Sequence, residues 1–260
     1  MFESKYDVIV VGGGHAGAEA AAAAANLGAK TLLVTMNLQT IGQMSCNPAM
    51  GGIAKGQIVR EIDALGGYSG VVSDLTAIQF KMLNKSKGPA MWSPRVQSDR
   101  AKFALKWREM LENTPNLDFY QDMVVGLIVE KNTIKGVVTG LGNKIHSHSV
   151  ILTNGTFLNG LIHVGDKNFG GGRVGEKSSV GITADLESYG FKSGRMKTGT
   201  PPRVDGRSLD YSVMEEQPGD KNPAKFSYLE SIQPLKHQIS CHITYTNKEV
   251  HDIMSESFDR

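Results

Sequence analysis

The sequence predicts an α/β protein: a doubly wound, Rossmann-like nucleotide-binding domain with a β meander, followed by the start of an inserted second domain. An apolar run at 7–11 leads through a glycine turn into an alanine-rich segment at 16–27. Short β-type runs separated by turns fill 117–152, and proline, glycine and charge become dense beyond about residue 195. We therefore expect a first domain over 1–200 and a second domain, truncated at the chain end, over 201–260.

The first elements form one supersecondary unit. The run Asp7–Val11 is rich in β-branched residues, the helix formers from Ala16 to Leu27 end at Gly28, and Thr31–Thr35 is again a β-type run. This order of strand, turn, helix and strand predicts a right-handed βαβ unit with two parallel strands.

The later elements are less regular. Segments 38–56 and 84–98 hold several glycines and prolines and are expected to be ordered loops, with a helix from 57 to 65 between them. An amphipathic helix over 98–112 offers four core candidates: Phe103, Leu105, Trp107 and Leu111. The expected strands of the meander are Val124–Val129, Ile134–Thr139 and Lys144–Leu152, and the polar segment 247–260 is expected to be helical.

Composition narrows the class of protein. With 28 basic and 26 acidic residues, the chain lacks an overall basic field, so any nucleic-acid contact must come from a local patch. Only two cysteines occur, Cys46 and Cys241, which form neither a disulfide framework nor a metal-ligand pattern. No run approaches ~18 apolar residues and no signal peptide precedes the first strand. We expect a cytoplasmic protein with no metal and no membrane contact.

The glycine turn predicts a dinucleotide site. In Gly12-x-Gly14-x-x-Gly17, the first glycine permits the sharp turn, the second lets a pyrophosphate approach the backbone, and the third lets helix and strand pack closely. The alternative is a glycine-rich turn without a ligand. Glu19, in the first helical turn, is expected to be exposed and favoured by the helix dipole.

The type of dinucleotide follows from what surrounds the turn. Rossmann sites for nicotinamide dinucleotides carry an acid about 20 residues on, but Thr35-Met36-Asn37 stands there instead. A β meander whose last strand leads into Thr153-Asn154-Gly155-Thr156 is similar to the arrangement in flavoproteins of the glutathione-reductase type. FAD is therefore the preferred ligand. Because no cysteine pair is present for disulfide chemistry, Cys46 acts alone or is inert.

Several longer motifs carry a family resemblance. They are Gly12-Gly13-Gly14-His15-Ala16-Gly17, the segment from Gly42 to Gly52 with Ser45-Cys46-Asn47-Pro48, Asn84-x-Ser86-Lys87-Gly88-Pro89-Ala90, Thr156-Phe157-Leu158-x-Gly160, Gly171-Gly172-Arg173 and Lys197-Thr198-Gly199-Thr200-Pro201-Pro202-Arg203. Together they resemble the tRNA uridine 5-carboxymethylaminomethyl modification enzymes, also called the glucose-inhibited division protein A family. The resemblance covers nearly the whole chain.

The resemblance implies an enzyme dependent on FAD and NADH. With a partner GTPase, in a heterotetramer built on a homodimer, it would add an aminomethyl or carboxymethylaminomethyl group at C5 of the wobble uridine of certain tRNAs, with methylenetetrahydrofolate as the carbon donor. The implied cofactor-binding residues are Gly12, Gly13, Gly14, His15, Ala16, Gly17, Val124 and Ser179. His15 has the alternative of an ordinary turn histidine, and nothing in local spacing selects Val124 or Ser179.

Cys46 is the candidate catalytic residue. A thiolate adding at C6 of uracil would make C5 nucleophilic, and backbone N–H groups, a helix start or Lys55 could stabilise that thiolate. The alternative is a structural cysteine packed near the flavin. The resemblance also implies a longer full-length chain with a second important cysteine in a Gly-Pro-Arg-Tyr-Cys-Pro segment. That segment does not occur in these residues. Which cysteine is the nucleophile stays open, and these 260 residues are expected to be inactive alone.

The sequence gives the least information about the residues that contact tRNA. Two local basic patches could bind tRNA phosphates or could be solvated faces: Lys192, Arg195, Lys197, Arg203 and Arg207 in one, Lys81, Lys85, Lys87 and Arg95 in the other. Trp92 and Tyr68 are candidate surfaces for stacking a flipped uridine. Competing functions are a folate-dependent tRNA uridine methyltransferase of the same flavin fold, which usually carries the acid that Thr35–Asn37 lacks, and a non-catalytic flavin-binding module.

Overall fold

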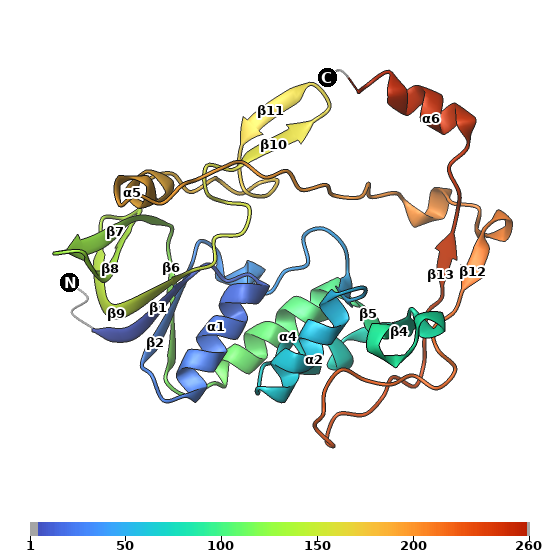
Figure 1. Ribbon diagram of the computed structural model, residues 1–260, viewed down its shortest axis with the longest axis horizontal. Helices are drawn as coiled ribbons and strands as arrows, with labels where there is room; N and C mark the ends of the chain where they lie inside the picture. Colours follow the sequence, from blue (N-terminus) through green and yellow to red (C-terminus); the bar gives the residue numbers. More distant parts are fainter. Residues whose placement is uncertain (1–4, 259–260) are drawn as a thin grey trace.

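A six-stranded sheet forms the first half of the fold. The computed structural model describes residues 5–258. The strand order is β6-β2-β1-β9-β8-β7, and the strands are β1 (Tyr6–Val11), β2 (Thr31–Thr35), β6 (Leu117–Gln121), β7 (Val124–Glu130), β8 (Thr133–Thr139) and β9 (Lys144–Leu152). The predicted α/β fold is confirmed, and Figure 1 shows this sheet at the left of the molecule.

The βαβ unit forms because its residues suit a buried parallel sheet. β1 pairs in parallel with β2 and with β9, so Ile9 and Val10 have neighbours on both sides and are fully buried. Parallel strands buried on both faces read as continuous apolar runs, as this one does. Helix α1 (His15–Asn26) covers the unit with small side chains, and its buried alanines are Ala18, Ala21, Ala22 and Ala25.

The meander is antiparallel and returns the chain to β1. β7 pairs with β8 and β8 with β9, while β9 joins β1 in parallel, with Val8 opposite Ser149 and Val11 opposite Leu152. The three predicted strands are thus confirmed. β6, which pairs in parallel with β2, was not predicted as a separate strand. The end of β9 now lies beside the glycine turn.

A second layer holds three helices and a small sheet. The helices are α2 (Lys55–Ala64), α3 (Ser69–Leu75) and α4 (Arg100–Glu112), and the sheet has the order β3-β5-β4 with β3 (Ala49–Gly51), β4 (Ala77–Leu83) and β5 (Ser93–Ser98). The predicted loop at 84–98 is therefore wrong in its second half. Short 3₁₀ turns lie at Leu38–Thr40, Lys85–Lys87, Pro89–Met91, Gly206–Ser208 and Tyr211–Val213.

Helix α4 supplies much of the core between these layers. Phe103, Trp107 and Leu111 are fully buried, as predicted, but Leu105 is 68% exposed. Two positions along an α-helix rotate a side chain by about 200°, so Leu105 points away from the face that holds Phe103 and Trp107. The prediction for Leu105 was wrong because it ignored this rotation.

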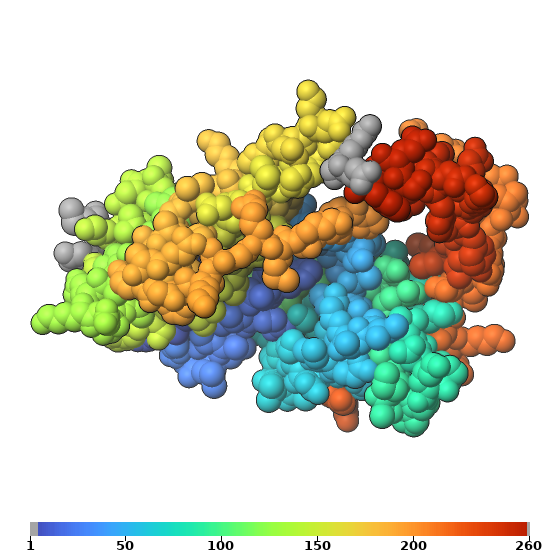
Figure 2. All heavy atoms as spheres, turned by 45° about the horizontal axis from the view of Figure 1, so that its top comes forward, coloured from blue at the N-terminus to red at the C-terminus, as the bar shows by residue number. Residues whose placement is uncertain are grey.

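The chain after the meander is extended and loosely packed at first. It forms the hairpin β10 (Leu161–Val164) and β11 (Lys167–Gly170) and then α5 (Ile182–Ser188). Residues 191–204 have no regular structure and are all exposed. Figures 1 and 2 show this part as a thin length of chain leaving α5 towards β12 (Glu215–Gln217), which pairs with β13 (Cys241–Ile243) before α6 (Lys248–Ser255). The predicted C-terminal helix is confirmed.

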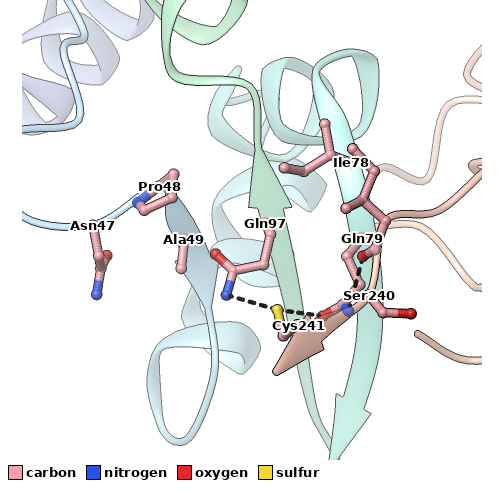
Figure 3. A pocket seen from close by; sticks show the side chains of 9 residues that line it. Asn47, Pro48, Ala49, Ile78, Gln79, Gln97, Ser240 and Cys241 are labelled. Atoms are coloured by element: carbon pink, nitrogen blue, oxygen red, sulfur yellow. Dashed lines mark hydrogen bonds between the residues drawn. The ribbon is translucent and has the colours of Figure 1, made fainter. Parts of the chain in front are cut away.

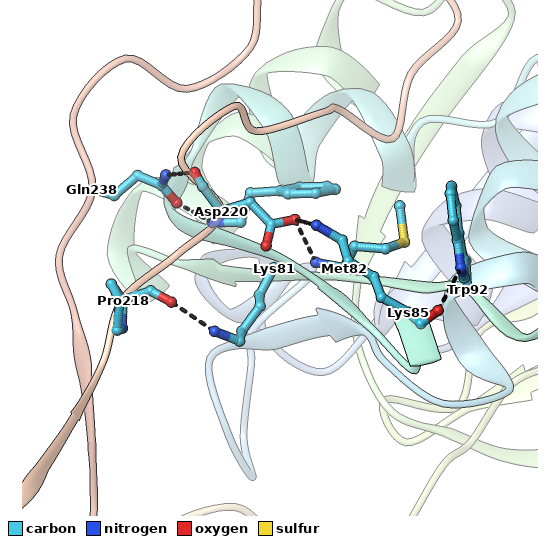
Figure 4. A network of polar contacts seen from close by, with 8 residues as sticks. Lys81, Met82, Lys85, Trp92, Pro218, Asp220 and Gln238 are labelled. Atoms are coloured by element: carbon cyan, nitrogen blue, oxygen red, sulfur yellow. Dashed lines mark hydrogen bonds and ion pairs between the residues drawn. The ribbon is translucent and has the colours of Figure 1, made fainter. Parts of the chain in front are cut away.

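Residues 218–238 fold back onto the edge strand β4 (Figure 4). Lys81 Nζ donates to Pro218 O at 2.8 Å, and the Asp220 carboxylate accepts from Met82 N and pairs with Lys85 Nζ, each at 3.0 Å. Gln238 completes the network by accepting from Phe80 N at 2.8 Å. In the described part of the chain, no helix has both the length and the apolar character needed to cross a membrane.

Candidate functional site

The glycine turn is locked by its neighbours at two of its three motif positions. Gly12 has φ +108°, and a Cβ there would lie 2.6 Å from Thr153 O. A Cβ on Gly17 would lie 1.7 Å from Gly12 O. The Thr153 hydroxyl donates to Val11 O at 2.8 Å, so the end of β9 braces the end of β1. These two glycines are required by the fold itself, with or without a ligand.

Gly14 is surrounded differently. It is the N-cap of α1, is exposed, and would place a Cβ in open space with no atom within 4 Å. Its φ of −75° is open to any residue, and no side chain caps the helix. The first N–H groups of α1 therefore face this space together with the positive end of the helix dipole, an arrangement that binds phosphate. The diphosphate of a dinucleotide fits this cradle.

His15 turns towards the protein rather than towards that space. Its Nε2 lies 3.1 Å from Gly42 O, and its ring packs edge-on against Phe103 at 5.4 Å. Burial lowers the pKa of His15, and the charges of Lys55 and Arg173 lower it further, while the bond to Gly42 opposes them. A neutral His15 thus ties the glycine turn to the loop that follows β2. Contact between His15 and a cofactor stays a prediction.

Val124 and Ser179 lie next to each other although 55 positions separate them. The Ser179 hydroxyl donates to Val124 O at 2.8 Å, and both residues are buried. Ser179 N also donates to Phe157 O at 2.8 Å, which links the start of β7 to the segment after β9. Their role as cofactor contacts stays a prediction, as does that of Gly13 and Ala16.

Cys46 is an exposed free thiol in the loop between β2 and β3. Its Sγ lies 3.9 Å from Thr200 Oγ1, and Arg203 Nη2 donates to the carbonyl oxygens of Ser45, at 3.2 Å, and Cys46. Lys55 Nζ donates to Ala49 O at 3.3 Å, three positions after Cys46 in the sequence. The sequence indicated Cys46 but not its contacts with residues 200 and 203.

Cys241 lies on β13 and borders a cavity of about 300 Å³ (Figure 3). Its thiol donates to Gln79 Oε1 at 3.4 Å and accepts from Gln97 Nε2 at 3.9 Å. The opposite wall is formed by Asn47, Pro48 and Ala49, the residues that follow Cys46. Both cysteines are thus close to one loop, with Cys46 exposed and Cys241 held by amide groups.

Most of the predicted basic side chains have partners within the protein. Lys81 and Lys85 bind residues 218–238, the segment that folds back onto β4. Arg95 donates to Gln79 Oε1 and Gln217 Oε1, each at 3.3 Å. In the other patch, Arg207 pairs with Asp205 at 2.7 Å. Lys192 and Lys197 are exposed on the extended segment. Binding of tRNA by these patches stays a prediction, and so does stacking on Trp92 or Tyr68.

The environment of Glu19 differs from the one expected from the sequence. Its carboxylate accepts from Tyr68 N at 3.0 Å and from Ser69 N at 2.5 Å, so it caps the start of α3 and is half-buried. The prediction of an exposed side chain was wrong, because Glu19 binds a partner 49 positions away in the sequence. Among the residues that the structure describes, no group of His, Cys, Asp and Glu side chains is placed to hold a metal ion.

Comparison with known proteins assigns the family. The family model described as "Glucose inhibited division protein A" matches residues 7–260. The chain belongs to the glucose-inhibited division protein A family. Within this family, it is 73% identical over 260 residues to the "tRNA uridine 5-carboxymethylaminomethyl modification enzyme MnmG" of Christiangramia forsetii and 74% identical to that of Flavobacterium johnsoniae. The whole chain is covered in both, with 42% of each relative, so it spans less than half their length.

Solved structures of the glucose-inhibited division protein A family agree with this fold. GidA of Aquifex aeolicus in its form II crystal matches with a TM-score of 0.95 and 48% identity, covering 100% of this chain and 44% of that one. The GidA-related protein from Thermus thermophilus matches with a TM-score of 0.52 and 24% identity over 73% of this chain and 70% of that one, a likeness of fold alone.

Proposed function

We propose that this chain is the flavin-binding part of an enzyme that modifies tRNA uridine. The observation that carries the proposal is the glycine turn, where Gly12 and Gly17 are fixed by the fold while Gly14 leaves open space at an uncapped helix start. The relatives' printed name supplies the reaction class, tRNA uridine 5-carboxymethylaminomethyl modification. We take FAD as the ligand because the turn is followed by the meander typical of flavoproteins.

The full reaction that we propose uses FAD, NADH and methylenetetrahydrofolate and takes place in the cytoplasm. A partner GTPase, in a heterotetramer built on a homodimer, assists the addition of an aminomethyl or carboxymethylaminomethyl group at C5 of the wobble uridine. FAD, when bound, supplies the redox chemistry of the one-carbon transfer. Residues 1–200 form the first part of the FAD domain in this proposal, and 201–260 begin an inserted domain associated with the nicotinamide.

The chain's own residues have two tasks in this reaction. The N–H groups that begin α1 hold the diphosphate at Gly14. The thiolate of Cys46 adds to C6 of the uracil, which moves the electron pair of the double bond towards C5 and O4 as an enolate. C5 then attacks an electrophilic one-carbon unit, loses its proton, and the thiolate leaves from C6. The exposure of Cys46 supports this role over that of a buried structural cysteine.

Flavin binding and tRNA modification test the proposal separately. The full-length protein is purified and assayed for flavin absorbance, for an increase in melting temperature on addition of FAD, and for modification of tRNA with the partner GTPase. A ligand that binds only the native state must stabilise it. Loss of modification in Cys46→Ser with FAD binding intact is the expected result. FAD binding without any turnover would favour a non-catalytic flavin module, and absence of FAD binding would overturn the proposal.

A further inference from the structure

The Cys46 loop is anchored at both ends and also at Gln43, which accepts from Arg173 Nη1, and at Met44, which is buried in the core, whereas Cys46 itself is exposed. At one end Gly42 N donates to Gly13 O at 2.8 Å, and at the other Ser98 N donates to Pro48 O at 2.7 Å. Between these anchors, within residues 5–258, the hydrogen bonds of Ser45 and Cys46 go only to residues 200 and 203. The polar contacts next to the thiol therefore come from a segment more than 150 positions away in the sequence.

That distant segment is the exposed length 191–204. It is held to the rest of the fold at Arg195, whose Nη2 donates to Asn159 O at 3.1 Å, and then at the Cys46 loop. Thr200 and Arg203 flank Pro201-Pro202, a dipeptide with fixed φ that favours polyproline II. Because that helix has about three residues per turn, positions 200 and 203 lie on one face. Both side chains indeed reach Cys46, and Arg203 also reaches Ser45.

The two contacts have different chemistry. Arg203 brings a permanent positive charge to the carbonyl oxygens of Ser45 and Cys46, which fixes the backbone beside the thiol. The Thr200 hydroxyl lies at the sulfur itself, 3.9 Å away, where it can donate a hydrogen bond. A cation and a hydroxyl donor both favour a thiolate over a thiol. Neither contact has another evident use on this exposed segment.

We propose that Thr200 and Arg203 are positioning residues for Cys46, with the guanidinium fixing the loop backbone and the hydroxyl donating to the sulfur as thiolate. This inference rests on the proposed function, because it takes Cys46 as the nucleophile. It predicts the reactivity of the thiol itself, however, and can be tested without tRNA. Residues 197–203 then complete the Cys46 site from a distant part of the sequence.

The test is the rate at which Cys46 is alkylated in the full-length protein purified with its flavin. Iodoacetamide is added at neutral pH, and peptide mass spectrometry follows the modification of Cys46 and Cys241 in the same sample. The variants Thr200→Val and Arg203→Met remove the donors at similar size, while Thr200→Ser and Arg203→Lys keep them. Arg207→Met is the matched control, because Arg207 follows that segment in the 3₁₀ turn Gly206–Ser208 and pairs with Asp205 instead.

We expect Thr200→Val and Arg203→Met each to slow alkylation of Cys46 by about two- to three-fold, because one hydrogen bond of about 1 kcal/mol is worth about five-fold and a sulfur without its donor is intrinsically more nucleophilic, which recovers about half of that on a logarithmic scale. Thr200→Ser, Arg203→Lys and Arg207→Met should stay near the wild-type rate, with Cys241 unchanged throughout. Alkylation of Cys46 in Thr200→Val as fast as in the wild type, or faster, would overturn the proposal.

The two proposals fail in different ways. If Cys46→Ser keeps full tRNA modification, Cys46 is not the nucleophile, and the proposed function must be revised even where alkylation responds to residues 200 and 203. If Cys46→Ser abolishes modification but Thr200→Val leaves alkylation unchanged, the proposed function stands and the positioning role is wrong. Should Arg203→Met fail to fold, the exposed and nearly isosteric Thr200→Val decides the matter alone.

Discussion

At the scale of single residues, the glycines of the turn separate folding from binding. Gly14 has φ −75° and no atom within 4 Å of a built Cβ. Gly14→Ala should therefore lower the stability of the flavin-free protein by no more than about 1 kcal/mol, the scale of an N-cap change. In the proposed cradle the same methyl group would occupy the space of the diphosphate, so we expect FAD affinity to fall by at least about ten-fold, or about 1.4 kcal/mol. Thermal melts without FAD and a fluorescence titration with FAD measure the two effects.

Gly17→Ala is the matched control for that experiment. Its Cβ would lie 1.7 Å from Gly12 O, a backbone atom that side-chain rotation cannot move away. Overpacking of this kind usually costs about 1–3 kcal/mol and more where backbone must shift, so Gly17→Ala should destabilise the protein before any ligand is added. Equal FAD affinity in Gly14→Ala and wild type would contradict the assignment of the cradle.

At the scale of elements, the capping of α3 by Glu19 is the contact to test. The carboxylate accepts the N–H groups of Tyr68 and Ser69, which begin this short helix. Glu19→Ala leaves both donors without their acceptor in a half-buried place, and we expect a loss of about 1–3 kcal/mol in the free energy of unfolding. Glu19→Gln, which keeps one acceptor oxygen, should lose less. Urea unfolding measures both, and equal stability of Glu19→Ala and wild type would show that water replaces the carboxylate.

Elements that depend on local sequence were predicted well, and those that depend on distant pairing were not. β1, α1 and β2 follow from one uninterrupted pattern, and α4 begins at Asp99, whose carboxylate caps it. β5 was taken for a loop because Pro94 and Arg95 break its pattern, yet β3 and β4 hold it on both sides. The pairing partners of a strand are set by the fold and not by its own residues.

The same distinction applies to the candidate site. The glycine turn lies within six consecutive residues, so its spacing alone predicts the cradle. Thr200 and Arg203 form hydrogen bonds with the Cys46 loop, and the Glu19 carboxylate accepts a hydrogen bond from Ser69 N. Contacts between such distant residues leave no periodic signal in a single sequence. The motif Thr200-Pro201-Pro202-Arg203 drew attention as a pattern, but only the fold shows what it touches.

At the scale of the whole molecule, the carboxylates of Asp63 and Asp74 join residues 218–238 to α2 and α3. Asp74 accepts from Phe226 N at 2.9 Å and from Ser227 N at 2.8 Å, and Asp63 accepts from Tyr228 N at 2.7 Å. Phe226 itself is fully buried in the core beneath α2 and α3. The segment that contains Phe226 is thus held by hydrogen bonds from its backbone N–H groups to the carboxylates of Asp63 and Asp74.

This docking predicts an unusual pH dependence of stability. Burial raises the pKa of Asp74 to about 6, and the charge of Asp63 adds to this, while the two N–H donors and Lys225 oppose it. Because the unfolded value is near 3.8, the native state binds the extra proton between these values, and the free energy of unfolding falls as pH rises through that window. Relative to Asp74→Asn, the wild type should lose about 1–3 kcal/mol between about pH 4 and pH 6, at about 1.4 kcal/mol per unit of pKa difference.

Urea unfolding of wild type and Asp74→Asn between about pH 4 and pH 6 measures the effect. Asp205→Asn is the control, because its stability difference from wild type should change with pH in the opposite direction. The hydrogen bonds from Arg207 lower the pKa of Asp205, so its contribution is present at higher pH and is lost as pH falls. Relative to Asp205→Asn, the wild type should therefore gain stability as pH rises, the reverse of the Asp74 comparison. Parallel stability curves for wild type and Asp74→Asn would mean that Asp74 is solvated in both states and that the segment around Phe226 is held by its apolar contacts alone.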